Sequence, residues 1–329
     1  MTQVILGIDT SCYQTSCAVV DLDGHLLSEA RNMLTVPENE RGLRQSEAVF
    51  QHIKQLPEVL EACFTKLKQY KIVAVCASNQ PVPQPGSYMP VFVAGASFGR
   101  AIAQTHQTSF YATSHQEGHF AAAGKGIKGL PDKYLAIHLS GGTTEILRVS
   151  TQGYLSLGKT LDISAGQLLD RLGVRMGFDF PAGASLEALA EGKKATGRYP
   201  AIVKNCSVSY SGVETEAIKD LESNTLSQAE IAAELFDVIT RSLVKMIDEA
   251  SKQTKVYDVL VTGGVASSRL LRKSLDVRLL KRVNRVKSSY GPPAYAGDNA
   301  VGVALIGRTK YILDKETNHG NRVKRKGTI

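Results

Sequence analysis

The sequence predicts an α/β fold built from two similar lobes, and three observations lead to this prediction. Strand-like and helix-like hydrophobic patterns alternate along the whole chain, which is typical of α/β proteins. With 329 residues the chain is too long for one small core and is best divided into about two domains. A segment that begins at Val4 is repeated in design by one that begins at Tyr134.

The repeat has the same order of elements in both copies. In VILGIDTSCYQTSCAVVDLDGHLLSEARN (4–32), a strand, a small-polar turn and a second strand lead to a hairpin turn at Asp23 and Gly24 and then to a third strand. The segment 134–160 again has a strand, a Gly/Ser/Thr loop, a strand, a turn with Gly153 and a third strand. This duplication suggests two lobes that face each other across a cleft, although two unrelated runs of antiparallel strands also look somewhat alike. We expect lobes at 1–130 and 131–329, with the final helix after residue 298 free to pack on the first.

The elements between the repeats are assigned by composition and period. The proline-rich start of 80–104 excludes a helix there, and Gly95 and Gly99 give the helix that follows a flat side for close packing. The segment 230–252 has the pattern of an amphipathic helix with its apolar stripe in the core.

Two glycine turns predict a nucleotide site. In LSGGTTE (139–145), Gly141 and Gly142 leave the backbone N–H groups bare for a phosphate, and the hydroxyl side chains add donors. In VLVTGGVASSRLLRKSL (259–275), a strand, the turn at Gly263 and Gly264 and a helix N-terminus follow one another, as in many nucleotide sites. A Walker A motif is missing, which excludes a P-loop protein.

His115 and His119 in SHQEGH (114–119) are four residues apart, so on a helix they lie on one face and can chelate a divalent ion. Local spacing alone favours the simpler interpretation, two solvated or capped histidines. Asp298, with Asn299, precedes an apolar helix, where it can cap the helix or complete a metal site.

Composition excludes several classes of protein. Hydrophobic residues at 43% and charged residues at 21% are ordinary for a globular protein. Apolar runs stay short of the about 18 residues of a membrane span, and the start lacks the pattern of a signal peptide. Five cysteines without a CxxC motif predict reduced thiols and a cytoplasmic protein. Basic residues gather in 279–287 and 321–329, which permits an RNA partner or a solvated face and tail.

Together these motifs resemble the tRNA threonylcarbamoyladenosine transferase family, long catalogued as O-sialoglycoprotein endopeptidases. The resemblance covers nearly the whole chain and keeps the motifs in order. They are GIDTSC (7–12), the Glu47/His52 pair, PGS (85–87) with the VAGASFGRAIA helix (93–103), SHQEGH, LSGG (139–142), LDISAGQLLDRLG (161–173), FPAG (180–183), SYSG (209–212), TGGVA (262–266) and GDNA (297–300).

The resemblance implies a duplicated actin/Hsp70/sugar-kinase-like fold and a site for metal and adenylate. It implies that His115, His119 and Asp298 bind the metal, which would hold the phosphate side of threonylcarbamoyl-AMP and polarise its carbonyl. The adenylate-binding positions of relatives fall on LSGG, which is Leu139, Ser140, Gly141 and Gly142, and on Asp170 and Gly183. The implied reaction transfers a threonylcarbamoyl group to the adenosine beside the tRNA anticodon, with a smaller paralogue and an ATPase as further partners.

His138 is a candidate gain in this chain. It stands two residues before Ser140, where archaeal and eukaryotic relatives carry a metal-binding tyrosine. If it joins His115, His119 and Asp298, three imidazoles and a carboxylate favour Zn or Fe over Mg. The alternative is a strand histidine that is hydrogen-bonded to its neighbours.

The chain also departs from the family pattern. The acidic pair of T-S-C-D-E-T is replaced by Tyr13 and Gln14, neither of which acts unaided as a general base near neutral pH. Thr143 follows the glycines of LSGG, Ser268 replaces an asparagine, and Glu214 replaces a lysine. The chain is therefore interpreted as a diverged paralogue, and two functions stay open: an active transferase, or a non-catalytic nucleotide- or metal-binding scaffold or regulator.

Peptidase activity is disfavoured by the histidine motif itself. In H-E-x-x-H the general base directly follows the first histidine, but Gln116 stands there and Glu117 is one step on. One residue is about 100° around a helix, so Glu117 faces another way.

Overall fold

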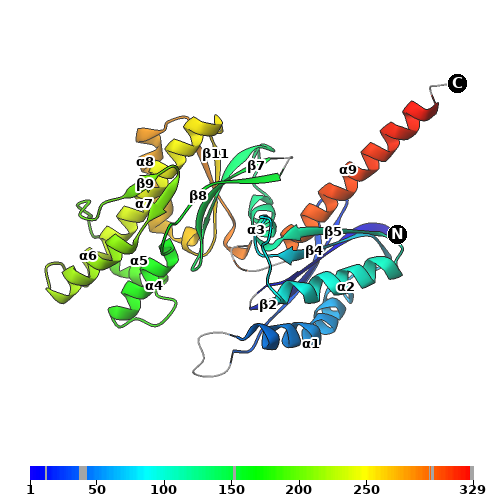
Figure 1. Cartoon of the computed structure of the whole chain (residues 1–329), viewed down its shortest axis with the longest axis horizontal. Helices are drawn as coiled ribbons and strands as arrows, with labels where there is room; N and C mark the ends of the chain where they lie inside the picture. Colours follow the sequence, from blue (N-terminus) through cyan, green and yellow to red (C-terminus); the bar gives the residue numbers. More distant parts are fainter. Residues whose placement is uncertain (12, 37–42, 151–152, 296, 298–299, 327–329) are drawn as a thin grey trace. The chain divides into compact units, whose positions relative to one another are not determined.

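The computed structural model describes residues 1–11, 13–36, 43–150, 153–295, 297 and 300–326. Two compact units divide the chain (Figure 1). The first unit comprises Met1–Lys125 together with Gly297–Ile329, and the second comprises Gly126–Ala296. No helix in the described ranges combines the length and the apolar character that crossing a membrane requires.

The first unit has a five-stranded sheet in the order β3-β2-β1-β4-β5. Its strands are β1 (Thr2–Thr10), β2 (Gln14–Asp21), β3 (Leu26–Met33), β4 (Tyr70–Gln80) and β5 (Ser109–Ser114). The first three strands are antiparallel neighbours, whereas β1, β4 and β5 run parallel. Gly24 has φ of +88°, so the predicted hairpin turn uses the left-handed backbone that glycine permits.

Helices cover both faces of this sheet (Figure 1). They are α1 (Gln45–Phe64), α2 (Val91–Thr105), α3 (His115–Gly124) and α9 (Val301–Lys326). A Cβ on Gly95 of α2 would lie 3.2 Å from Ile8, and one on Gly7 would lie 2.5 Å from the backbone of Ala304 in α9. Adjacent residues of a strand point to opposite faces, so α2 and α9 pack on opposite sides of β1. The prediction that Gly95 lets its helix pack closely is confirmed.

The second unit repeats the same plan. Its sheet has the order β12-β11-β6-β7-β8, with β6, β7 and β8 antiparallel and β6, β11 and β12 parallel. The strands are β6 (Tyr134–Leu139), β7 (Thr144–Ser150), β8 (Gly153–Lys159), β11 (Asp258–Thr262) and β12 (Lys287–Tyr290). The strands of both units therefore follow one order and one set of directions, which confirms the predicted α/β class and the internal duplication.

Further helices and a short hairpin complete the second unit. The helices are α4 (Ala165–Arg175), α5 (Gly183–Ala190), α6 (Ser211–Glu222), α7 (Gln228–Thr254) and α8 (Arg269–Arg282), and β9 (Ile202–Lys204) pairs with β10 (Ser207–Ser209) as a hairpin. The predicted helix 230–252 is α7. It is buried around most of its circumference, and the buried Glu234 accepts hydrogen bonds from the backbone of Thr196, Gly197 and Arg198. The core therefore surrounds α7.

Candidate functional site

The histidine pair lies at the start of α3 in the first unit. Ser114 is the N-cap of this helix: its hydroxyl accepts a hydrogen bond from the Glu117 N–H at 3.2 Å, and its own N–H donates to the Glu117 carboxylate at 2.7 Å. This capping box fixes the first turn. Thr113 also donates to Glu117 at 2.9 Å, so the glutamate of SHQEGH serves the helix start and points back to β5.

The two imidazoles face each other. His115 Nε2 and His119 Nε2 are 3.0 Å apart, and the rings meet edge to face with centroids 4.4 Å apart. His119 is buried, while the His115 side chain keeps 20% of its exposure. Two nitrogens that each lie about 2.1 Å from one ion in tetrahedral geometry are roughly 3.4 Å apart. The observed spacing suits a shared ion after a small adjustment, or a single N–H···N hydrogen bond.

Asp9 contacts the ring nitrogen of His115 that does not face His119. The carboxylate is completely buried at the end of β1, and both of its oxygens lie 3.1 Å from His115 Nδ1. Ser78 on β4 donates a hydrogen bond to the same carboxylate. A metal-binding histidine commonly donates its second ring N–H to a carboxylate, which fixes the tautomer and directs the other nitrogen to the ion. The donor set around His115 therefore fits a metal ligand.

Asp9 is a site residue that the sequence patterns did not reveal. A carboxylate that ends the apolar strand VILGID (4–9) was the available signal, since a buried charge needs a partner. That partner is 106 residues away in sequence, and no local pattern identifies it.

The structure does not assign two of the predicted metal ligands, Asp298 and His138, to the same site as His115 and His119. Asp298 lies outside the described residues. His138 is buried on β6 in the second unit, across from Glu145 of β7 and Thr262 of β11. Because His115 and His119 belong to the first unit, the membership of His138 and Asp298 in a common metal site stays a prediction.

The turn that replaces the family's acidic pair lies between β1 and β2. Tyr13 is 43% exposed, and Gln14 begins β2. Thr15, the next residue, has its hydroxyl 2.8 Å from Nδ1 of the buried His52. Burial lowers the pKa of His52, while the Ser11 backbone and the charge of Asp9 act in the opposite direction. His52 is thus neutral at pH 7 and offers this turn no positive charge.

The LSGG turn is anchored to the N-terminus of α4. The Ser140 N–H donates to the Thr143 carbonyl at 2.9 Å, and the Thr143 N–H donates to the Ser140 hydroxyl at 3.1 Å. The Ser164 hydroxyl, which caps α4, donates to the Gly141 carbonyl at 2.7 Å. A Cβ on Gly166 would lie 2.5 Å from the Ser140 carbonyl oxygen. The missing side chain of Gly166 therefore lets the LSGG turn lie against the N-terminus of α4. A helix N-terminus interacts favourably with anions.

The second glycine turn packs against the first. Gly263 follows β11 with φ of +104°, and a Cβ there would lie 2.2 Å from the Leu139 carbonyl oxygen. Gly264 is open, with no atom within 4 Å of its Cβ position. Ser268 then caps α8, its hydroxyl accepting a hydrogen bond from the Leu271 N–H at 3.1 Å. The predicted strand, Gly-Gly turn and helix are thus β11, residues 263–264 and α8.

A pocket of about 450 Å³ opens between these turns and α4 and α5. Four residues from the predicted nucleotide set line it: Gly141, Asp170, Gly183 and Gly264. The remaining lining residues are Gly166, Leu169, Phe180, Pro181, Ala184, Glu187, Phe236, Val265, Ser267 and Ser268. Its size is within the range of small-molecule sites. Leu139, by contrast, has its side chain fully buried in the core, so only its backbone faces the turns.

Asp170 supports one wall of the pocket. Its carboxylate accepts a hydrogen bond from the Ala182 N–H at 2.9 Å, which holds the FPAG loop beside α4. Glu187 accepts from the Leu270 N–H at 2.8 Å and links α5 to the start of α8. The pocket is thus lined by residues that are far apart in sequence and are held by short polar contacts.

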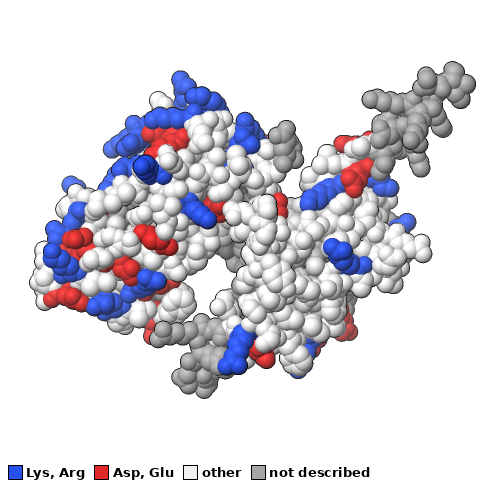
Figure 2. Space-filling model, viewed as in Figure 1, with Lys and Arg blue, Asp and Glu red and all other residues white. Residues whose placement is uncertain are grey.

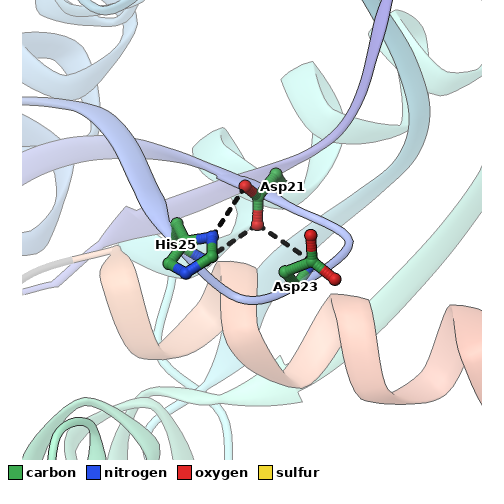
Figure 3. A group of neighbouring side chains, drawn as sticks. All are labelled: Asp21, Asp23 and His25. Atoms are coloured by element: carbon green, nitrogen blue, oxygen red, sulfur yellow. Dashed lines mark hydrogen bonds and ion pairs between the residues drawn. The ribbon is translucent and has the colours of Figure 1, made fainter.

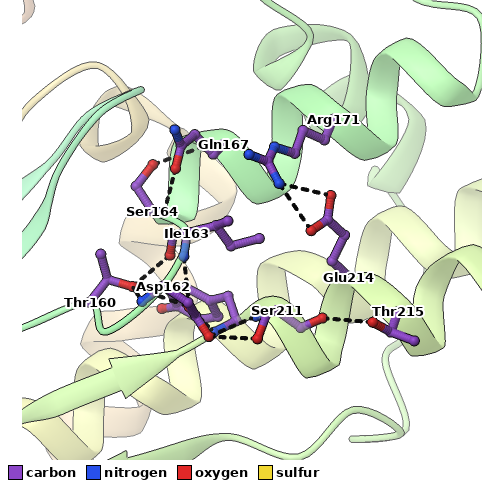
Figure 4. Close-up of polar contacts among 10 residues, drawn as sticks. Thr160, Asp162, Ile163, Ser164, Gln167, Arg171, Ser211, Glu214 and Thr215 are labelled. Atoms are coloured by element: carbon purple, nitrogen blue, oxygen red, sulfur yellow. Dashed lines mark hydrogen bonds and ion pairs between the residues drawn. The ribbon is translucent and has the colours of Figure 1, made fainter.

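Glu214, which replaces the expected lysine, forms an ion pair that joins α6 to α4 (Figure 4). Its carboxylate lies 3.3 Å from Arg171 of α4. Asp162 accepts hydrogen bonds from the Tyr210 N–H at 2.8 Å and the Ser211 hydroxyl at 2.7 Å, at the start of α6. The glutamate therefore pairs within the unit, where a lysine would meet Arg171 with like charge.

Asp21, Asp23 and His25 form the one group of three possible metal ligands close together in the described part of the chain (Figure 3). Asp21 accepts hydrogen bonds from the backbone N–H groups of Asp23 at 2.9 Å and His25 at 2.8 Å. These contacts form the β2–β3 hairpin turn, and they account for the cluster without an ion.

The chain is similar to known proteins over most of its length. The model of the TsaD family, described as tRNA N6-adenosine threonylcarbamoyltransferase, matches residues 26–305. A tRNA N6-adenosine threonylcarbamoyltransferase of Thermus thermophilus is 29% identical over 307 residues, which cover 92% of this chain and 91% of that protein. A probable bifunctional tRNA threonylcarbamoyladenosine biosynthesis protein of Methanothermobacter thermautotrophicus is also 29% identical, over 93% of this chain but 55% of its own length.

Solved structures share the fold at low sequence identity. Component A of the Acidaminococcus fermentans (R)-2-hydroxyglutaryl-CoA dehydratase has a TM-score of 0.57 and 18% identity, covering 94% of this chain and 100% of that one. A ROK family glucokinase from Streptomyces griseus has a TM-score of 0.54 and 11% identity, covering 93% and 99%. The sugar-kinase-like fold expected from the sequence is confirmed, and the chain belongs to the tRNA N6-adenosine threonylcarbamoyltransferase family.

Proposed function

We propose that the chain transfers a threonylcarbamoyl group from threonylcarbamoyl-AMP to the adenosine next to the tRNA anticodon. The observation that carries this proposal is the pocket of the second unit, which gathers Gly141, Asp170, Gly183 and Gly264 around one space. Because the chain belongs to this family, we expect the adenylate to bind in this pocket. The anion-favouring start of α4 beside Gly141 supports a phosphate there.

The proposed reaction is acyl transfer. The adenosine amino nitrogen attacks the carbamoyl carbon, the bond from that carbon to the phosphate oxygen breaks, AMP leaves, and the amino group loses one proton. Backbone N–H groups at Gly141 and Gly142 and the start of α4 would stabilise the negative charge on the departing phosphate. The group that accepts the proton is unassigned, because Tyr13 and Gln14 stand where the family's acids are expected.

We also propose a metal site at His115 and His119, with Asp298 as third ligand and His138 as a further candidate. Asp9 supports this proposal by fixing the ring of His115. Imidazole ligands favour Zn or Fe over Mg. When bound, such an ion would supply a Lewis acid for the carbamoyl carbonyl. Substitution of His115 or His119 by alanine should abolish binding of zinc and ferrous iron, measured by calorimetry.

The transferase proposal is tested by incubating the chain with threonylcarbamoyl-AMP and unmodified tRNA, together with the smaller paralogue and the ATPase that the family resemblance implies. Formation of the modified adenosine supports the proposal. No product, under conditions where a relative with both acids is active, would contradict it.

A non-catalytic role as nucleotide- or metal-binding scaffold or regulator is the second candidate, and the replacement of the acids by Tyr13 and Gln14 favours it. Transfer activity of the unsubstituted chain separates the two, and the double substitution Tyr13→Asp with Gln14→Glu shows whether the missing acids are the cause of inactivity. A scaffold gains transfer activity from the restored acids, or stays inactive while it still binds AMP. An active transferase already forms product before the change.

Peptidase activity is not proposed. The Glu117 carboxylate accepts hydrogen bonds from Thr113 and from the Ser114 N–H and hydroxyl, at 2.7–2.9 Å, so it is used in the start of α3 and is turned away from the metal face.

A further inference from the structure

Two short segments carry the excess positive charge of the chain: residues 269–287 of the second unit and the tail 321–329. Residues 269–287 contain eight Lys or Arg residues and one acid, Asp276, which is a net charge of +7 out of +8 for the whole chain. The segment forms α8 and its connection to β12. Figure 2 shows Lys and Arg gathered where Figure 1 places α8. Outside the tail, the excess positive charge is therefore local to this segment.

The helix directs these charges outward for a simple reason. Leu271, Leu275 and Leu279 repeat every four residues and are fully or almost fully buried against the core. A single apolar stripe of this kind leaves the opposite face to solvent. Lys273 and Lys281 are on that exposed face.

Three of the eight basic residues have a structural role. Arg272 donates to the Ala266 carbonyl at 2.6 Å and stacks on Tyr290 with 4.9 Å to the ring centroid. Arg278 pairs with Asp237 of α7, and Arg282 lies 3.8 Å from Asp248 of the same helix. These contacts fasten α8 to its neighbours.

The other five basic residues form no ion pair with any residue in the described ranges. We call them the basic surface; all five are exposed. They are Arg269, Lys273, Lys281, Arg285 and Lys287. An exposed group of like charges without acidic partners has a favourable interaction only with an anionic partner or with counterions.

We propose that the basic surface binds the phosphate backbone of RNA. The inference rests on the proposed function, in which tRNA is the substrate. It assigns a surface of the protein that contacts parts of the tRNA other than the reacting adenosine. Lys and Arg that neutralise phosphates release counterions, so such binding is salt-dependent and carries little sequence information. Tyr290 is half-buried under Arg272 and is unsuited to base stacking. Recognition here is therefore of the backbone.

An acidic protein is the other anionic partner that this charge would suit. Protein interfaces usually have an apolar centre with charges at the rim. On this face only Val277 and Leu280 are exposed large apolar residues within 269–287, at 49% and 73%. Two such side chains among the basic residues make a small centre, so the charge pattern favours RNA.

The test measures binding of unmodified tRNA to the full chain by fluorescence anisotropy between about 50 and 200 mM salt, without threonylcarbamoyl-AMP. The variant is Lys281→Gln with Arg285→Gln. The matched control is Lys193→Gln with Lys194→Gln, which removes the same charge from exposed positions in the same unit. If each side chain contacts one phosphate, the slope of log affinity against log salt falls by about two, and the loss of affinity over this salt range shrinks by roughly tenfold. The control should bind as the unsubstituted chain does.

Three results would overturn the RNA assignment: no tRNA binding at the lowest salt concentration, equal slopes for the variant and the control, or binding of poly-L-glutamate at a salt concentration that releases tRNA. The last result would assign the surface to an acidic protein. AMP binding to each variant, measured in parallel, reports on the pocket alone. If tRNA binding does not depend on the basic surface while AMP binding and transfer are intact, the RNA assignment is wrong and the proposed function is unaffected. If the chain shows no transfer but its tRNA binding depends on the basic surface, the proposed function is wrong and the RNA assignment is unaffected.

Discussion

His115 Nδ1 lies 3.1 Å from both carboxylate oxygens of Asp9, and His115 Nε2 lies 3.0 Å from Nε2 of His119. One imidazole thus joins a buried carboxylate to a second imidazole. The carboxylate fixes which ring nitrogen carries the proton, which leaves the other available as a ligand. The contact links the end of β1 to the start of α3.

The substitution Asp9→Asn tests this relationship. The amide keeps the shape of the side chain but removes the charge that orients the His115 ring. Affinity for zinc or ferrous iron, measured by calorimetry, should fall by about ten- to hundredfold, the usual effect of removing such a supporting carboxylate. Asp314→Asn removes the same charge from α9 of the same unit, where the carboxylate accepts a hydrogen bond from Tyr111 at 2.7 Å, and should leave metal affinity unchanged. Equal affinities for both variants would contradict the role of Asp9.

The two glycines of the second turn should respond differently to alanine. Gly263→Ala combines a φ of +104° with a Cβ 2.2 Å from the Leu139 carbonyl oxygen, so we expect a loss of about 2–4 kcal/mol in the free energy of unfolding. Gly264→Ala has open space for its methyl group and should fold normally. Because Gly264 lines the pocket, its methyl group should weaken AMP binding in calorimetry. Normal AMP affinity in Gly264→Ala would remove this turn from the proposed nucleotide site.

The contact between α3 and α9 depends on one glycine more than on the other. A Cβ on Gly302 would lie 1.8 Å from the Gly118 carbonyl oxygen, whereas the nearest atom to one on Gly118 would be a methyl carbon of Val303 at 3.1 Å. Gly302→Ala should therefore lower the free energy of unfolding by about 3 kcal/mol or more. Gly118→Ala should change it by less than about 1 kcal/mol, because higher helix propensity offsets the small shift of Val303. Urea denaturation measures both, and similar losses for the two variants would contradict the stronger dependence on Gly302.

Asp162 should make stability depend on pH. Burial alone would raise its pKa, but hydrogen bonds from the Tyr210 N–H, from Ser211 and from the Ile163 N–H hold the pKa below its ordinary value. A carboxyl group with a lowered pKa stabilises the fold above its unfolded pKa of about 3.9. That contribution is lost as the pH falls through the folded pKa.

Asp162→Ala should therefore cost about 1–2 kcal/mol at pH 7, since the start of α6 loses its acceptor. The difference from the unsubstituted chain should shrink below about pH 4. Thr215→Ala removes a hydroxyl that bonds to Ser211 within the same helix and serves as control, with a small difference that does not change with pH. A constant difference for Asp162→Ala from neutral pH down to about pH 3 would contradict the assigned role.

The sequence by itself determined the elements that depend on local pattern. The repeat of strand, polar turn, strand and hairpin follows from hydrophobic period and turn chemistry, so the three antiparallel strands of each sheet could be predicted from 4–32 and 134–160. The glycine turn at 263–264 and the helix-borne pair His115 and His119 are equally local, because their geometry follows from neighbours within about four residues. The ordered motifs added the family.

Only the tertiary structure decided the contacts between distant residues. Asp9 meets His115 across 106 positions, and Arg171 meets Glu214 across 43. The helix α9 follows the entire second unit in sequence but packs on β1, because Gly7 leaves room for Ala304. The hydrophobic period of a helix or strand predicts which of its faces is buried, but it does not predict which element packs against that face. That choice is made by the packing of the whole chain, where a single missing Cβ or one buried carboxylate selects the neighbour.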